Sequence, residues 1–171
     1  MRLNKQLIYV VAISCMSMLY TSCTKEPGSP TNPPVGNAPV TPHQQQLLDL
    51  VNNSRSKGCD CGNKYYPPVP AVTWNTQLEE AAKKHSEYMN GTGKLSHTGQ
   101  NNSDAGERIN NEGYDWMTYG ENIAEGYPTE EAVIDAWLKS EGHCKNIMDA
   151  EFKEMGVATS GAFWTQVFAA K

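Results

Sequence analysis

Apolar side chains recur at helical spacing in several stretches of this chain. In residues 41–58, a Thr-Pro pair supplies the preferred first residues of a helix, and Gly58 ends it. The buried face of this helix is supplied by Leu47, Leu48, Leu50 and Val51. The pattern therefore predicts a first helix that packs one face against a core.

A second helix is predicted from Thr76 onward. Thr76 is a favourable N-cap residue, and Glu79 three residues later completes the pattern of a capping box. One helical stripe, at i, i+4, i+7 and i+11, is formed by Leu78, Ala82, His85 and Met89. A histidine on an apolar stripe favours a hydrogen-bonded core residue over a ligand, and we expect this of His85.

Two further helices are expected downstream. Residues 91–102 are rich in glycine, serine and asparagine, which predicts a loop that carries His97. A short helix is predicted over 104–111, and Arg108 on it is able to pair with an acidic residue that the sequence does not identify. The last helix begins at Thr129, and one face of it carries Val133, Trp137, Ser140 and Cys144.

Alternation of apolar and polar residues replaces helical spacing near the C-terminus. Residues 155–160 and 162–169 predict two strands around Gly161, with Val157, Trp164, Val167 and Phe168 suited to a pleated core. Helices and strands are mixed without the regular repeat of βαβ units. The pattern therefore indicates an α+β domain.

Residues 1–22 have the features of a bacterial lipoprotein signal peptide. A short basic region precedes a mostly apolar run of about a dozen residues, too few for a bilayer core that needs about 20. Ser22-Cys23 closes this run, with Tyr20 where the common lipobox has leucine. We expect Cys23 to be lipidated and to anchor the protein to the outer membrane of a bacterial envelope. The alternative is an ordinary cleaved signal with an incidental cysteine.

Residues 23–40 form a predicted tether, because they hold half of the prolines in the chain and show no apolar periodicity. Residues 41–171 are then long enough for one domain with its own core. The formal net charge is −5, and it becomes −7 without residues 1–22, which carry Arg2 and Lys5 but no acid. An acidic domain without a basic run argues against nucleic acid as a partner.

Three cysteines lie beyond the signal region: Cys59, Cys61 and Cys144. An oxidising envelope compartment permits one disulfide, and an odd count leaves one thiol over. Cys59 and Cys61 are too close in the sequence to pair comfortably with each other. A zinc site made by the three cysteines and His143 is an alternative, but the one-residue spacing is poor for tetrahedral thiolate ligation.

Several motifs occur in an order that resembles the bacterial branch of the CAP (SCP-like) superfamily of cysteine-rich secretory proteins. They are Ser96-His97-Thr98-Gly99, Gly120-Glu121-Asn122-Ile123-Ala124, residues 137–148 and residues 163–168. The resemblance covers roughly residues 43–170. It implies a three-layer α-β-α sandwich with a central antiparallel sheet. It also favours Cys61, which precedes a glycine as in many bacterial relatives, as the disulfide partner of Cys144.

The same resemblance implies a surface cleft with two histidines and two glutamates that binds a divalent metal in some members. His97 and Glu121 match one histidine and one glutamate. Ser140 and Phe163 stand where the second glutamate and the second histidine fall, and we expect His143 to replace the missing imidazole. His97, Glu121 and His143 are therefore predicted to share one cleft as catalytic candidates, with His97 and His143 as ligands of Zn²⁺ or another divalent ion.

Three functions from different classes follow from this resemblance. The first is a non-enzymatic binding module for a lipid, a glycan or a partner protein, with no cofactor required. The second is a metal-assisted, peptidase-like hydrolase that uses the same cleft. The third is a structural or host-interaction domain with a vestigial cleft. The incomplete tetrad and the lack of a recognised nucleophile motif favour the first.

Overall fold

The computed structural model of this chain describes residues 39–171. The predicted signal peptide, Cys23 and nearly all of the predicted tether lie outside the described residues. None of the helices in the described part has the length and apolar character needed to cross a membrane.

A four-stranded sheet forms the centre of the domain, with the strand order β3-β5-β6-β4. The strands are β3 (Thr73–Trp74), β4 (Thr118–Glu125), β5 (Glu154–Ser160) and β6 (Phe163–Ala170). β6 runs antiparallel to both β4 and β5, whereas the short edge strand β3 runs parallel to β5. The hairpin of β5 and β6 turns at Gly161, where φ is +57°, and it confirms the two predicted strands.

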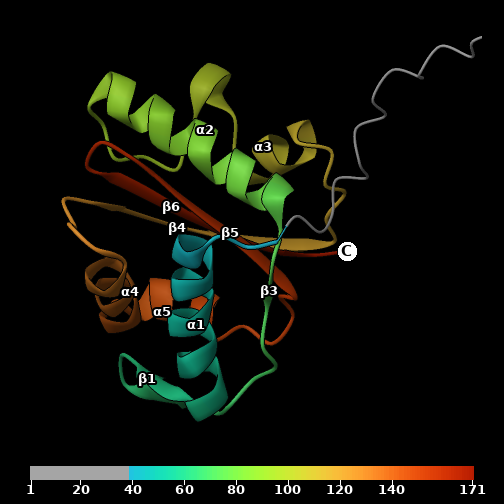
Figure 1. Ribbon diagram of the computed structural model, residues 1–171, viewed down its shortest axis with the longest axis vertical. Helices are drawn as coiled ribbons and strands as arrows, with labels where there is room; N and C mark the ends of the chain where they lie inside the picture. The colour runs from blue at the N-terminus through green and yellow to red at the C-terminus, as the bar shows by residue number, and fades with distance from the viewer. Residues whose placement is uncertain (1–38) are drawn as a thin grey trace, which may run out of the picture. The chain divides into compact units, whose positions relative to one another are not determined.

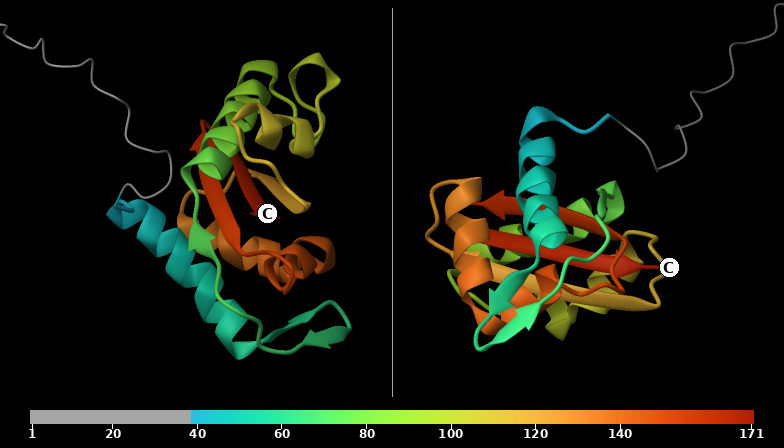
Figure 2. Two further views of the ribbon diagram at one scale, coloured as in Figure 1. Left: turned by 90° about the vertical axis from the view of Figure 1, so that its right-hand side faces the viewer. Right: turned by 90° about the horizontal axis from the view of Figure 1, so that it is seen from below.

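Helices cover both faces of this sheet (Figures 1 and 2). On one face lie α2 (Thr76–Thr92) and α3 (Ala105–Asn111), and on the other lie α1 (Pro42–Lys57), α4 (Glu130–Lys139) and α5 (Glu141–Ile147).

Alternate residues of β6 pack against the two helical layers. Trp164 and Phe168 pack into the core cluster that contains α1, α4 and α5, whereas Val167 and Ala169 pack with residues of α2 and α3. Side chains of a strand alternate between its faces, so a strand covered on both sides is buried throughout, as β6 is. The predicted α+β class and α-β-α sandwich are confirmed. The sheet is antiparallel as predicted except at its edge, where the two residues of β3 pair parallel to β5.

The helix starts show one prediction confirmed and one wrong. Thr41 caps α1, and its hydroxyl accepts from the Gln44 amide while the Gln44 side chain accepts from the Thr41 amide. α2 is capped by Asn75, not by Thr76, because the Asn75 side chain accepts from the amides of Gln77 and Leu78. This shift by one residue places Glu79 too far along the helix to complete a capping box.

The prediction of one long helix from Thr129 through Cys144 is wrong, because the helix is interrupted at Ser140. Thr129 does cap α4, but Ser140 has extended backbone angles (φ −92°, ψ 121°) and separates α4 from α5. The new direction of α5 brings the Cα of Cys144 within 5.4 Å of the Cα of Cys61. A disulfide joins these two cysteines. Cys61 belongs to a small antiparallel hairpin formed by β1 (Cys59–Cys61) and β2 (Lys64–Tyr66).

A buried arginine holds α1 to the segment after α5. Arg55 is fully buried, and its guanidinium donates to the carbonyl oxygens of Pro70 (2.8 Å), Ile147 (2.6 Å), Asp149 (2.9 Å) and Phe152 (3.4 Å). A guanidinium has five N–H donors in a fixed plane, so it can satisfy several carbonyls that no helix or sheet uses. Arg55 thus replaces regular secondary structure where these loops meet the core.

Candidate functional site

Glu121 lies on β4 and faces the layer of α2 and α3. Its strand neighbours at even spacing, Tyr119 and Ile123, belong to core clusters on that same side of the sheet. The next residue, Asn122, faces the opposite layer and donates to the carbonyl oxygen of His143 on α5 (3.2 Å). Successive side chains of a strand point to opposite faces of the sheet, so the adjacent polar residues Glu121 and Asn122 serve different layers. β4 lies at the edge of the sheet.

Two basic side chains form hydrogen bonds with the Glu121 carboxylate. Arg108, in the last turn of α3, donates from Nη2 to Oε2 at 2.5 Å, and Nδ1 of His97 lies 2.8 Å from Oε1. Arg108 also donates from Nη1 to the carbonyl oxygens of His97 (3.2 Å) and Ser103 (2.9 Å). Because the Glu121 side chain is only 4% exposed and that of Arg108 10%, this is a mostly buried ion pair. It fixes the loop between α2 and α3 onto the sheet.

His97 is the exposed member of this cluster. Its side chain is 60% exposed, although it contacts a carboxylate that is almost inaccessible. Glu121 can only accept, so Nδ1 of His97 carries a proton in this contact, and Nε2 is left for solvent or a ligand. The arrangement fixes the orientation of an accessible imidazole.

His85 is the buried member of the cluster, as its position on the apolar stripe of α2 predicts. Its side chain is fully buried on α2, and its Nε2 lies 2.8 Å from the carbonyl oxygen of Ser96 and 3.9 Å from Glu121 Oε1. Nε2 therefore carries the proton, while Nδ1 has no hydrogen-bond partner. Burial lowers the pKa of His85, although the nearby Glu121 carboxylate opposes this shift.

His143 does not join the contact between His97 and Glu121. It lies on α5, and no side-chain hydrogen bond links its ring to either residue in the described part of the chain. Burial, and after it the charge of His97, lowers its pKa. The α5 helix packs against the other face of the sheet (Figure 1), yet the charge of His97 still acts on the His143 ring, so a place for His143 as the second imidazole stays a prediction. Glu141, the glutamate next to Ser140 in the sequence, does not take the place of the missing second glutamate, because it pairs with Lys145 on the exposed side of α5.

A network of buried amides connects the site strand to α5. Asn146 donates to the carbonyl oxygen of Glu121 (3.1 Å) and to Oδ1 of Asn122 (2.8 Å). Asn122 is fully buried, and it donates in turn to Oε1 of Gln166 on β6 (2.9 Å). These contacts supply a hydrogen-bond donor to the Glu121 carbonyl oxygen on the edge strand β4 and hold the backbone of Glu121 in place.

Two hollows are lined by members of the ionic cluster. One has a volume of about 320 Å³ and is lined by His97, Thr98, Ser103, Tyr119 and Glu121 among others. The second, of about 560 Å³, lies between α2 and α3, and His85, Tyr88 and Arg108 contribute to its wall. The cluster thus lines both hollows: His85 and Arg108 line the larger one, and Glu121 and the exposed His97 line the smaller one.

Glu121 is poorly placed to be a third ligand of the divalent metal predicted at His97 and His143. Both oxygens of Glu121 already face positive or proton-donating groups, and Arg108 adds a fixed positive charge beside them. Among residues 39–171, the one group of three potential ligands within 4.8 Å of each other is Cys59, Cys61 and Cys144. Three such sulfurs are close enough to hold a metal, but a disulfide joins two of them.

The Glu121 carboxylate is poorly placed to act as a general base. A general base needs a free lone pair within reach of a substrate proton, and the carboxylate of Glu121 has neither spare oxygens nor exposure. Its role in this arrangement is to orient His97 and Arg108. An exposed imidazole edge beside hydroxyl and amide groups is suited to hydrogen-bonding a ligand.

The sequence alone identifies neither the acidic partner of Arg108 nor the approach of His85 to Glu121. The signal for Arg108 was its position near the C-terminal end of a short helix, but only the fold shows that the acid is Glu121, 13 residues away. His85 was correctly placed on a buried stripe. Its approach to Glu121 depends on how α2 crosses the sheet, which spacing along one helix does not reveal.

Comparisons with known proteins agree with this fold. The family model "CAP: Cysteine-rich secretory protein family" matches residues 48–168. YkwD of Bacillus subtilis is 30% identical over 134 residues, which cover 77% of this chain and 49% of YkwD. A solved extracellular protein with an SCP domain from Bacillus anthracis has 30% identity and a TM-score of 0.66, covering 79% of this chain and 45% of that one.

An outer surface protein from Borrelia burgdorferi shares the fold alone, at 19% identity and a TM-score of 0.62 over 74% of this chain and 91% of that one. The present chain spans about half the length of YkwD and of the Bacillus anthracis protein.

Proposed function

This chain belongs to the cysteine-rich secretory protein (CAP) family, and we propose that it is a non-enzymatic module that binds an envelope glycan beside His97. The observation that carries this proposal is the state of Glu121. Its two oxygens are taken up by Arg108 and His97, so the acid holds the site together instead of reacting.

The lining of the smaller hollow supports a glycan over a lipid chain. Thr98, Asn102 and Ser103 place hydroxyl and amide groups around the exposed His97 imidazole. Tyr119 contributes an aromatic ring, which packs edge-on against Trp116 at 4.5 Å. Hydroxyl-rich ligands need such hydrogen-bonding groups together with an apolar surface for the sugar ring. A lipid chain would leave these polar groups without partners.

Binding of soluble N-acetylglucosamine oligomers, measured by calorimetry and by NMR shifts, tests the proposal. We expect His97→Ala to weaken binding by roughly tenfold, which corresponds to about 1.4 kcal/mol and one lost hydrogen bond. His43→Ala is the matched control, because His43 is an exposed histidine on α1 that pairs with Glu130 away from this hollow. Equal affinities for the two variants, or no binding by the parent protein, would overturn the glycan assignment.

A hydrolase is the second candidate, and the contact between Nδ1 of His97 and Glu121 is the observation that favours it. An imidazole that is oriented by a carboxylate can act as a general base through its other nitrogen. Cleavage of the same oligomers, or of peptides, that disappears in His97→Ala but persists in His43→Ala would replace the binding module with this function. A Zn²⁺ titration of both variants separates metal-assisted from metal-free cleavage.

We further propose that a lipid on Cys23 anchors the domain to the bacterial outer membrane, facing either the periplasm or the exterior. The lipoprotein-like residues 1–22 support this anchor, and the description of the Bacillus anthracis relative as extracellular supports export. Cys23→Ser should move the protein from the membrane fraction to the soluble fraction. Cys15→Ser, which alters a cysteine inside the apolar run, should not. A Cys23→Ser protein that stays with membranes contradicts the anchor.

A further inference from the structure

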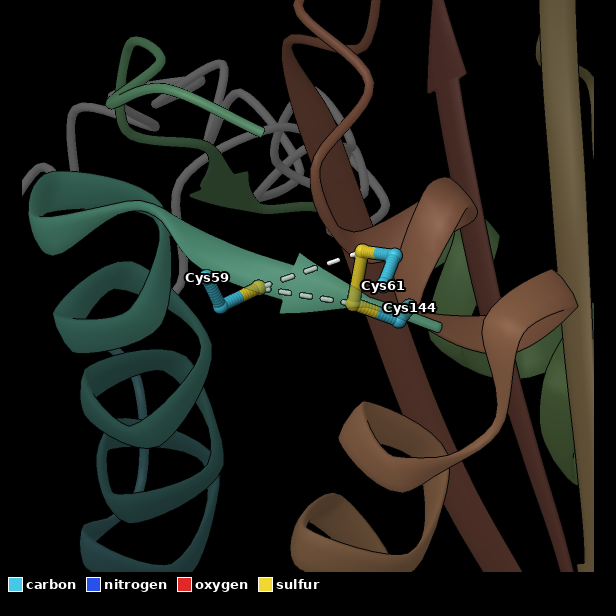
Figure 3. A group of neighbouring side chains, drawn as sticks. All are labelled: Cys59, Cys61 and Cys144. Carbon is cyan, nitrogen blue, oxygen red and sulfur yellow. Dashed lines mark hydrogen bonds between the residues drawn. A yellow bond between two sulfur atoms is a disulfide. The ribbon is translucent and has the colours of Figure 1, made fainter. Parts of the chain in front are cut away.

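Three sulfurs gather where the β1–β2 hairpin meets α5 (Figure 3). Cys59 and Cys61 are two residues apart on β1, so their side chains leave the same face of the strand. The Sγ of Cys59 lies 3.4 Å from the Sγ of Cys144 and 3.9 Å from that of Cys61. The free thiol therefore touches the disulfide that links Cys61 to Cys144.

The three sulfurs differ in their access to solvent. Cys61 and Cys144 are both fully buried, whereas Cys59 is partly exposed. A thiol or disulfide in solution can therefore reach Cys59 in the folded domain, but it cannot reach the disulfide itself. Exchange at a buried disulfide is limited by this access as well as by the nucleophile.

We propose that Cys59 is a thiol–disulfide exchange site that connects the buried Cys61–Cys144 disulfide to thiols and disulfides in solution. In the reducing direction, the Cys59 thiolate attacks Sγ of Cys144, a Cys59–Cys144 bond forms, and Cys61 leaves as a thiolate. An external thiolate then attacks the accessible Cys59 sulfur and releases Cys144. A second external thiolate attacks the resulting mixed disulfide and frees Cys59.

The steps balance with an ordinary thiol as the reductant. Two external thiols become one external disulfide, and the Cys61–Cys144 disulfide becomes two thiols that take up the two protons. The oxidising direction reverses each step: an external disulfide first forms a mixed disulfide on Cys59, Cys144 then displaces the external group, and Cys61 finally displaces Cys59. Two electrons pass to the external disulfide.

One movement is needed for the first step. Attack on a disulfide proceeds along its S–S axis, and the similar distances from the Cys59 sulfur to the two bonded sulfurs place it beside the bond rather than on that axis. Rotation of the Cys59 side chain about its Cα–Cβ bond changes this angle without moving the strand. Cys59 begins β1 directly after the helix-terminating Gly58, at the open end of the hairpin, where the side chain is only partly covered.

The exchange site is independent of the proposed glycan site. The three cysteines pack with the core cluster of α1, α4 and α5, on the face of the sheet opposite to the ionic cluster of Glu121. Failure of one proposal therefore leaves the other unaffected.

Reduction of the native protein tests the relay. Every protein would be the full chain with Cys15→Ser and Cys23→Ser, so that Cys59, Cys61 and Cys144 are its only cysteines. The oxidised protein is treated with reduced dithiothreitol, quenched with acid, alkylated and mapped by mass spectrometry. We expect Cys59→Ser to slow loss of the Cys61–Cys144 disulfide roughly tenfold or more. Equal rates would overturn the proposal, because reduction would then proceed by opening of the domain.

Two further variants exclude an indirect effect. Lys64→Ala changes an exposed residue of the same hairpin and should leave the reduction rate unchanged. Any destabilisation by Cys59→Ser would speed reduction, so slower reduction cannot arise from unfolding. Cys61→Ser should contain a Cys59–Cys144 disulfide after oxidation. Two free thiols in that variant would also overturn the proposal, since Cys59 would then be unable to reach Cys144.

Discussion

Replacing Glu121 with glutamine tests whether the ionic cluster holds the loop between α2 and α3 on the sheet. The substitution keeps the size of the side chain but removes the charge that faces Arg108 and His97. Arg108 then remains in a position where its side chain is only 10% exposed, without an anionic partner. The structure therefore predicts lower stability and a looser loop.

The magnitude follows from the burial of both partners. Two charges about 4 Å apart attract by roughly 4 kcal/mol at an effective dielectric constant of about 20. Desolvation offsets much of this attraction while the pair is intact, but removal of one partner of a buried pair typically costs about 3–5 kcal/mol. The glutamine oxygen still accepts one hydrogen bond, so we expect the lower end, about 3 kcal/mol, for Glu121→Gln. Coupling with Arg108→Met should be about 2 kcal/mol.

Urea unfolding of Glu121→Gln, Arg108→Met and the double variant gives this coupling energy directly. Glu125→Gln is the matched control, because it changes an exposed glutamate at the end of the same strand and should shift stability by less than about 0.5 kcal/mol. Limited proteolysis should cut residues 93–104 faster in Glu121→Gln than in the control. A coupling energy below about 0.5 kcal/mol, with unchanged proteolysis, would refute the role given to the ion pair.

The remaining predictions concern pH and a second buried cation. Burial lowers the pKa of both His85 and His143, so the unfolded chain binds protons more readily than the folded one below about pH 6.5. Their contribution to stability is fully present above that pH and is lost as pH falls through the lowered values. The urea midpoint should fall as the pH is lowered from about 7.5 to about 5, and it should fall less steeply in His85→Gln than in the parent protein. The same dependence of the midpoint on pH in both proteins would contradict this assignment. Arg55→Lys should lower the free energy of unfolding by about 2 kcal/mol or more, because an ammonium cannot reach all four carbonyl oxygens. An unchanged urea midpoint would show that these contacts do not contribute to stability.

Local patterns in the sequence predicted most of the elements. The Thr41-Pro42 start, the stripe through Leu78 and Met89 and the hairpin around Gly161 each depend on residues near one another in the chain. Caps and turns are local interactions, which explains why they were largely correct. The errors also have local causes: Asn75 outcompetes Thr76 as a cap, and Ser140 divides an expected helix.

The sequence by itself determined the α+β class, the family and the candidates His97 and Glu121, because these depend on periodicity and on motifs of adjacent residues. Only the tertiary structure decided what those candidates contact. Side-chain contacts between α2, α3 and β4 depend on how the helices cross the sheet, and this crossing paired Glu121 with Arg108 and brought His85 nearby. The alternation of β4 at the edge of the sheet likewise placed Glu121 and the helix of His143 on opposite faces.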